Sequence, residues 1–350
     1  MYWLAKIFKP DYKGLSAPLA LLVLELILID FVFLVTNRDT AYMLSAIFGT
    51  LFVGLSDPGG AFKRRVGPMA FTSAAGALLT ALGFSLDTAA WGWITLVAFG
   101  VTLLSGLSLK FGLHRFITTL LLNVWFVVAL GIGSGYSQSH IATNTWGQAL
   151  AWLGGGALWF VVALVLWLLN GRTAHPLVAD IPTDNTERPL TKPVVAFAVL
   201  RALALAVAVA IPAGLTLEHG YWIPIATLIA MKTDLTQGAT TSLQRLVGAA
   251  VGAGLAALLL WAISNKLQLV IIALILLANG VAIRFVNYAW YCAAIAAGAL
   301  TASGLFQPTS HTAEWERVWY TFIGLSIGML VTLLATIRGK QGADVSPQSQ

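Results

Sequence analysis

The sequence is dominated by apolar runs that follow one another along almost the whole chain, separated by short polar breaks. Many of these runs approach the length of about 20 helical residues that is needed to cross the hydrocarbon core of a bilayer. Stretches such as Leu255 to Trp261 and Val161 to Leu169 are apolar on every side, whereas barrel strands alternate in polarity. Only 10% of the 350 residues are charged, against roughly 25% in an ordinary soluble domain. The sequence therefore predicts an all-α, polytopic membrane protein that is embedded in the lipid bilayer.

About twelve membrane spans of this length can be placed, six on each side of a polar linker. The spans of the first half are expected at about 17–36, 40–56, 67–86, 89–108, 116–135 and 146–169. Those of the second half are expected at about 194–215, 221–233, 243–263, 267–283, 287–306 and 315–337. The predicted organisation is a membrane half at 1–170, a linker at 171–192, a second membrane half at 193–338 and a tail at 339–350.

The positions of the basic residues predict the orientation of these spans. When the loops are assigned alternately to two sides, sixteen of the 20 Lys and Arg residues fall on one side, and three, Arg38, Lys266 and Arg317, fall on the other. Cytoplasmic loops carry such an excess of basic residues, so we expect both termini and the linker in the cytoplasm. The net charge of +6 is spread in small groups at the ends of apolar runs. It therefore indicates topology rather than a nucleic-acid partner.

The two halves resemble each other in the order of their residues. In the first, a span ends near Asp57 and is followed by Lys63-Arg64-Arg65 and a helix rich in small residues. In the second, a span opened by Tyr221-Trp222 ends near Asp234 and is followed by Arg245 and another Gly-rich helix. Both halves begin on the same side, so the predicted architecture is two parallel six-helix repeats related by an axis along the membrane normal. The alternative is an accidental likeness between two apolar, Gly-rich sequences.

Glu25 and Asp30 are the only acidic residues well inside a predicted span. An ionised side chain in hydrocarbon costs several kcal/mol and is tolerated mainly where it faces protein or water. The two residues lie about 140° apart around a helix, so at most one of them faces a common pathway, and Asp30 can instead be solvated at the outer interface. Both are candidates for proton coupling. The counterpart of Glu25 in the second half is Arg201, which either pairs with Glu25, contacts a substrate or extends to the cytoplasmic headgroups.

The segment from Tyr221 to Gly254 is the second candidate region. Pro224 follows an aromatic pair at the start of a short span, and interrupted helices at matching places in two halves are a sequence signal of a transport site. Aromatic rings beside an arginine suit a planar organic anion. The substrate-pathway candidates are therefore Tyr221, Trp222, Arg245, Arg201 and Asp234. The alternative is that the aromatic residues lie in the membrane interface and Arg245 only sets the topology.

No residues with the spacing of an enzyme site are found in the sequence. The five histidines, His114 among them, lie at or near the ends of predicted helices, without the spacing of metal ligands, and are expected to be solvated. A Gly-x-x-x-x-Gly-Lys-Ser/Thr loop for phosphate is absent from the sequence. We therefore expect no catalytic residue, no metal and no other cofactor.

This second half resembles the fusaric acid resistance family, which is allied to the bacterial aromatic acid exporters. The resembling residues are Gly220-Tyr221-Trp222-Ile223-Pro224, Asp234 and Leu243-Gln244-Arg245-Leu246-Val247-Gly248. Arg201 before an Ala/Leu-rich helix, and Arg284 with Asn287-Tyr288, are also similar to that family. The resemblance is clear over about 198–306 and faint over about 38–86.

The resemblance implies an efflux transporter of the bacterial inner membrane for small aromatic or amphipathic organic acids, with a periplasmic adaptor protein as a partner. Many members of the family carry a sizeable cytoplasmic domain, in whose place this chain has the short linker at 171–192. Because no ATP-binding loop is present, we expect the proton gradient to drive transport, and association with further copies of the chain is also an expectation. The alternative is a non-transporting membrane scaffold or anchoring subunit.

Overall fold

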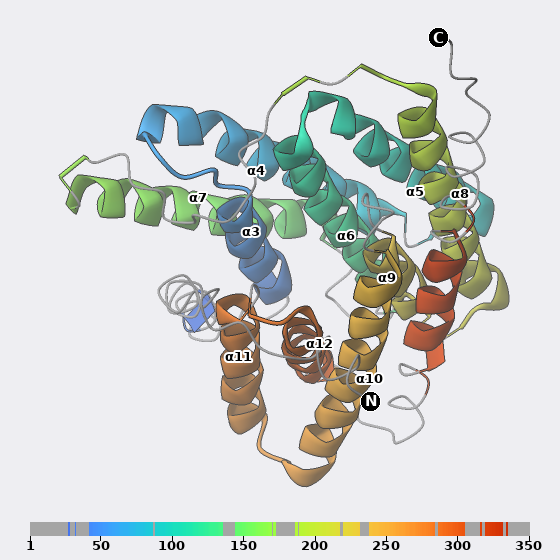
Figure 1. Ribbon diagram of the computed structural model, residues 1–350. Helices are drawn as coiled ribbons and strands as arrows, with labels where there is room; N and C mark the ends of the chain where they lie inside the picture. Colours follow the sequence, from blue (N-terminus) through green and yellow to red (C-terminus); the bar gives the residue numbers. More distant parts are fainter. Residues whose placement is uncertain are drawn as a thin grey trace. The chain divides into compact units, whose positions relative to one another are not determined.

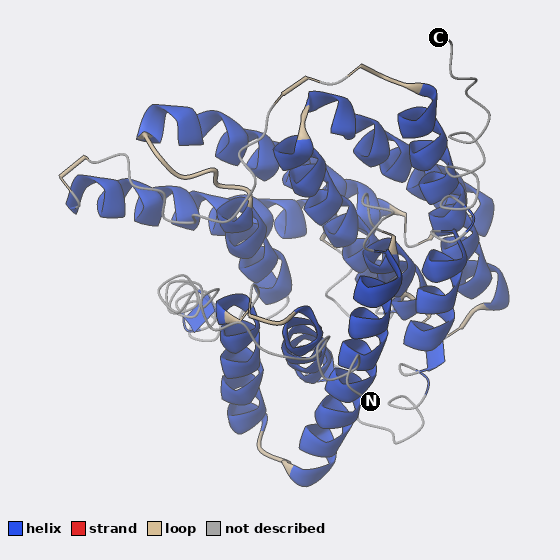
Figure 2. Ribbon diagram, viewed as in Figure 1, coloured by secondary structure: helices blue, strands red, loops and turns tan. Residues whose placement is uncertain are grey.

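The computed structural model describes residues 27–28, 32, 42–86, 88–135, 144–169, 171–172, 186–187, 189–217, 220–231, 238–283, 286–304, 316, 319–331 and 334. Throughout these residues, the regular elements are helical (Figure 2). Within the same ranges, five helices are long and apolar enough to cross a membrane. The prediction of an all-α, multi-pass membrane protein is confirmed, whereas the count of twelve spans stays a prediction.

The chain forms two compact units. The amino-terminal unit contains helices α3 (Met43–Leu55), α4 (Phe62–Ser85), α5 (Trp91–Leu107), η3 (Ser108–Phe111), α6 (Leu113–Gly135), α7 (Thr145–Leu169) and α8 (Lys192–Leu215) (Figure 1). The described residues of the carboxy-terminal unit begin at Trp222 and contain α9 (Trp222–Ala230), α10 (Gly238–Ala262), α11 (Lys266–Ala282), α12 (Tyr288–Gly304) and a helical segment at 319–331.

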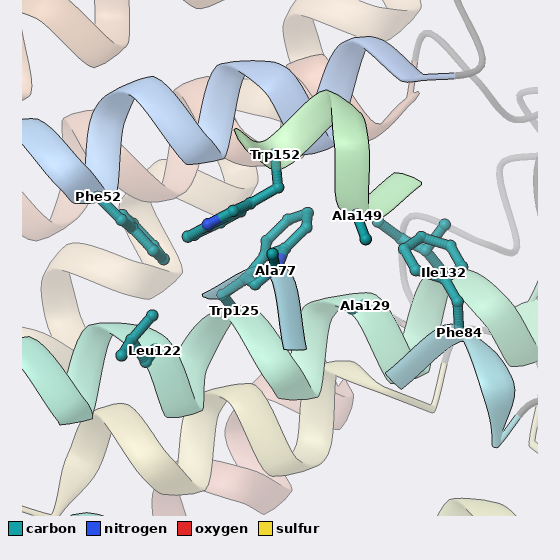
Figure 3. Packing of buried hydrophobic residues seen from close by; sticks show 9 residues of the cluster. All are labelled: Phe52, Ala77, Phe84, Leu122, Trp125, Ala129, Ile132, Ala149 and Trp152. Atoms are coloured by element: carbon teal, nitrogen blue, oxygen red, sulfur yellow. The ribbon is translucent and has the colours of Figure 1, made fainter. Parts of the chain in front are cut away.

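Two buried tryptophans form the centre of the amino-terminal unit. Figure 3 shows Trp125 of α6 and Trp152 of α7 side by side, with ring centroids 5.0 Å apart. Phe52 of α3 meets the Trp152 ring edge-on at 6.2 Å. The two indole nitrogens donate to α4, Trp125 to the Thr80 hydroxyl at 2.7 Å and Trp152 to the Ser73 carbonyl at 3.1 Å. Helices in lipid associate through such packing and hydrogen bonds, because lipid tails are as apolar as the side chains.

Helices α3 and α7 pack with their backbones in contact. The Thr50 hydroxyl lies 3.1 Å from the carbonyl oxygen of Ala46 in its own helix and 3.0 Å from that of Gly155 in α7. A Cβ atom added at Gly155 would overlap the Ala46 carbonyl oxygen. A glycine at this position is therefore what permits the close approach of the two helices.

The same contact occurs in the carboxy-terminal unit. The Thr227 hydroxyl of α9 lies 2.9 Å from the Ile223 carbonyl oxygen and 3.0 Å from that of Gly324, in the segment 319–331. A Cβ atom at Gly324 would overlap the Ile223 carbonyl oxygen. Since Thr50 precedes Asp57 by the same interval that separates Thr227 from Asp234, the contact supports the predicted internal duplication.

Helix α8 belongs to the second half in sequence but packs on α5 of the first half. A Cβ atom added at Gly106 of α5 would lie 2.7 Å from the Cβ of Ala198 in α8. The compact units therefore divide after Tyr221 rather than in the linker at 171–192. The two membrane halves stay a prediction from the sequence. They do not coincide with the compact units, because α8 of the second half packs on α5 of the first.

Exposed tryptophans gather at the helix ends that the sequence assigns to the outer face. Five of them lie at such ends: Trp91, Trp93, Trp146, Trp261 and Trp319. Trp290 is also exposed and lies near the start of α12, at a predicted inner end. Tryptophan is enriched where a membrane protein meets the headgroup layer, so these positions are consistent with the predicted span boundaries.

The α3–α7 contact predicts that alanine substitutions at two adjacent glycines change the stability of the protein in opposite directions. We expect Gly155→Ala to lower the free energy of unfolding by about 1–3 kcal/mol, because the new methyl group overlaps the α3 backbone. Gly154 has open space around its Cα. Gly154→Ala should therefore raise stability by up to about 1 kcal/mol through helix propensity. Thermal unfolding of the purified variants in detergent checks this, and equal melting temperatures for both would contradict the contact.

Candidate functional site

Arg201 is a charged residue in the middle of α8 and is fully buried by protein, at 0% exposed. Its neighbours on the same stripe of the helix, Ala198, Ala202 and Leu205, are buried too. Residues three and four positions apart lie on one helical face, so the protein-facing side of α8 includes the arginine. The side chain is therefore covered by protein, which contradicts the expectation that it extends to the cytoplasmic headgroups.

The guanidinium of Arg201 lies over an aromatic ring and makes no hydrogen bond within the described part of the chain. Its Cζ atom is 5.2 Å from the centroid of Phe116 in α6. The Nε, Nη1 and Nη2 atoms are all buried, and none of them has a partner among the described residues. A cation over a ring is attracted by the ring's quadrupole, but the ring accepts few of the hydrogen bonds that water would have accepted. The site thus holds a dehydrated positive charge with unused donors.

Polar side chains also line the contact between α5 and α6, but these have partners. The Asn123 amide nitrogen donates to the Thr102 hydroxyl at 3.1 Å. The hydroxyls of Ser108 and Thr119 lie 2.6 Å apart. Buried polar groups are generally satisfied in this way, and Arg201 differs from them. Among the described residues, no group of three or more His, Cys, Asp or Glu side chains is arranged to hold a metal ion.

A buried ion pair joins the end of α3 to the start of α4. Asp57 and Arg65 are each 1% exposed. The Arg65 Nε donates to Asp57 Oδ1 at 2.8 Å, and its Nη2 donates to Oδ2. The carboxylate accepts two further bonds, from the Gly59 backbone at 2.9 Å and from the Trp159 indole of α7 at 3.0 Å. The two charges neutralise each other, and the bidentate geometry with the two added donors offsets the cost of removing both charges from water. This pair is therefore a structural feature of the helix contact.

Residues 63–65 count together as a topology signal in the sequence, but in the structure Arg65 also has a role inside the protein. The residue lies in the first turns of α4 and is buried, whereas Lys63 and Arg64 are exposed. The expectation that His114 is solvated is wrong, because it is 2% exposed. The sequence contained a signal for the ion pair, because an acid before a Gly-rich helix and an arginine within that helix occur in both halves: Asp57 with Arg65, and Asp234 with Arg245.

The remaining sequence candidates are only partly described. Tyr221 closes the amino-terminal unit and packs on Gly131 of α6, where an added Cβ would overlap the tyrosine. Trp222 opens α9 and packs against Ala253, Ala256 and Leu300 of α10 and α12. Arg245 is in α10, and its side chain is not described; Glu25, Asp30 and Asp234 lie outside the described residues. The described residues therefore bring Arg201 together with Phe116 but do not unite all the candidates.

Short helices occupy matching places in the two halves. Helix α3 has 13 residues and α9 has 9, so at about 1.5 Å per residue neither alone crosses a hydrocarbon core of about 30 Å. Pro224 lies in the first turn of α9, where the missing N–H needs no helical partner. The proline thus does not interrupt α9, and the shortness of both helices is the feature that fits a transport pathway.

The ion pair predicts a large and specific loss of stability. We expect Asp57→Asn to lower the free energy of unfolding by about 3–5 kcal/mol, because it leaves the buried Arg65 uncompensated. Arg64→Ala removes an exposed charge next to it, so its effect should stay within about 0.5 kcal/mol. Chemical denaturation of the two detergent-solubilised variants measures both. A loss for Asp57→Asn no greater than for Arg64→Ala would show that the pair does not hold α3 to α4.

Comparison with known proteins identifies the second half. Residues 186–331 match the fusaric acid resistance protein-like family, and this range encloses the resemblance expected at about 198–306. No curated protein and no solved structure matches the chain. The matched range includes α8 with Arg201, whereas Phe116, Asp57 and Arg65 precede it. The chain is thus a helical membrane protein whose residues 186–331 are similar to the fusaric acid resistance protein-like family.

Proposed function

We propose that this protein is a transporter that exports small aromatic or amphipathic organic acids across the bacterial inner membrane, using the proton gradient. The apolar helices and the family match support a membrane transporter. The observation that carries the choice of substrate is Arg201, a buried guanidinium in the matched domain with no hydrogen-bond partner among the described residues. A positive charge held dehydrated in a membrane protein favours a negatively charged ligand.

The arrangement of the helices supports a pathway rather than a scaffold. The short helices α3 and α9 stand at corresponding places in the two halves, as in transporters whose sites lie at the interface of repeats. Tyr221, Trp222, Arg245 and Asp234 remain candidates for contact with the substrate along this pathway. Both termini and the linker are proposed to lie in the cytoplasm, and a periplasmic adaptor protein is proposed to continue the export route.

Glu25 and Asp30 are the proposed proton-coupling residues. A carboxyl group inside a span can carry a proton when it alternates between the two sides of the membrane, and acidic residues in transporters serve this role. Export of an anion against its gradient then draws on the inward movement of protons. Glu25 is the first candidate because it lies deeper in its predicted span than Asp30.

Transport by the purified chain in proteoliposomes tests the proposal. With an imposed pH gradient, we expect the wild-type protein to move 4-hydroxybenzoate faster than protein-free vesicles, which correct for passive permeation. Glu25→Gln should reduce gradient-driven transport to the protein-free rate, because an amide cannot carry the proton. Glu187→Gln, at an exposed position in the linker, should leave it unchanged.

Two results would count against this function. Gradient-driven transport that persists in Glu25→Gln would remove that residue from the coupling step. Absence of transport across a panel of aromatic and amphipathic acids would contradict export. Together with loss of cellular function on deletion of residues 171–192, that absence would favour the scaffold.

A further inference from the structure

The position of the Arg201 guanidinium is fixed by two helix contacts. Helix α8 lies on α5 at a backbone approach that only small residues permit, where Gly106 faces Ala198. The side chain of Arg201 then reaches Phe116 of α6, at 5.2 Å from Cζ to the ring centroid. Three helices of one compact unit thus determine where the charge lies.

The ring of Phe116 leaves the hydrogen-bonding edge of the guanidinium unused. The ring attracts the positive charge through its quadrupole, but it does not replace the hydrogen-bond acceptors that the N–H groups would have in water. All three nitrogen atoms are buried and without a partner among the described residues. Two parallel N–H groups in a fixed plane match the two oxygens of a carboxylate, whereas a lysine ammonium offers a point charge without this fork.

Several buried polar side chains of the same unit are already hydrogen-bonded to other groups. The Asn123 amide of α6 hydrogen-bonds Thr102 of α5, and the Thr119 hydroxyl of α6 hydrogen-bonds Ser108 of η3. The buried carboxylate of Asp57 is occupied by Arg65, Gly59 and Trp159. Arg201 is therefore the described buried charge whose donors are left for a ligand.

We propose that Arg201 and Phe116 form a composite recognition site for the carboxylate of a planar aromatic acid, in which Phe116 is a positioning residue that holds the guanidinium fork. This inference rests on the proposed function and specifies its site. Phe116 precedes the matched domain at 186–331, so the family domain supplies the charge and the preceding half supplies the ring that orients it. Recognition of the acid thus requires both halves of the chain.

Binding of benzoate to the full-length purified protein tests the site directly. In equilibrium dialysis with radiolabelled benzoate, we expect Arg201→Gln to weaken binding about a hundredfold, since the charge and its hydrogen bonds are lost. Arg201→Lys keeps the charge but loses the fork, so binding should weaken about tenfold. Arg64→Gln, at an exposed arginine, should bind as the wild type does.

The role of Phe116 has its own readout. Phe116→Leu keeps an apolar side chain but removes the ring, so we expect about tenfold weaker benzoate binding. Chloride competition should be little changed, because a spherical anion does not need an oriented fork. Phe71→Leu, at an exposed position in α4, is the matched control. Equal weakening of benzoate and chloride binding by Phe116→Leu would overturn the positioning role.

Competing occupants of the site predict different results. If inorganic phosphate displaces benzoate as well as another aromatic carboxylate does, the site is one for phosphate headgroups and the proposal is overturned. If Arg201 is the counter-ion of Glu25, the double variant Arg201→Gln, Glu25→Gln should regain the thermal stability lost by Arg201→Gln and still bind benzoate, which would also overturn it. We expect no recovery of benzoate binding in the double variant.

The outcome separates this inference from the proposed function. Benzoate binding that depends on Arg201 in a protein that transports nothing would support the site and contradict the exporter. Transport of aromatic acids that is insensitive to Arg201→Gln would support the exporter and overturn the site.

Discussion

Hydrocarbon does not hydrogen-bond or solvate charge, so every charged group inside a membrane protein must find its environment within the protein. The amino-terminal unit contains two different responses to this constraint. Asp57 and Arg65 neutralise each other and are surrounded by added hydrogen bonds. Arg201 is equally buried, but it lies over the Phe116 ring and has no hydrogen-bond partner among the described residues. The Asp57–Arg65 pair holds helices together, whereas Arg201 keeps N–H groups that can bind an anion.

Close contacts between helix backbones fix the positions of the helices that carry these charged residues. Thr50 with Gly155 in one unit and Thr227 with Gly324 in the other form the same hydroxyl-to-carbonyl contact across two helices. Backbones that touch in this way fix both the distance and the rotation of the helices. The same contact therefore occurs twice, in helices that the sequence places at corresponding positions of the two predicted repeats.

Much of this structure could be predicted from the sequence. Long apolar runs identify a helical membrane protein because hydrocarbon requires them, and the resemblance noted around Tyr221 falls within the range 186–331 that matches the family. The burial of Arg65 could not be read from the run pattern, since an excess of basic residues in cytoplasmic loops does not tell which of them is paired inside the protein. The packing of α8 on α5 was not predictable either, because it joins helices far apart in sequence. Arg201 could be named as a candidate from its position in a span. Its contact with the Phe116 ring could be found only from the three-dimensional structure.

The central claim is that two parallel six-span halves place their interior charges around one route through the bilayer. Labelling of single cysteines in intact cells tests it most directly, in a background where the buried Cys292 is replaced by alanine. We predict that a membrane-impermeant maleimide does not label His175→Cys in the linker or Val345→Cys in the tail until the cells are permeabilised. Ser264→Cys, in the exposed loop between α10 and α11, should be labelled in intact cells. Labelling of residues 175 and 345 from opposite sides would require an odd number of spans between them and would contradict the parallel duplication.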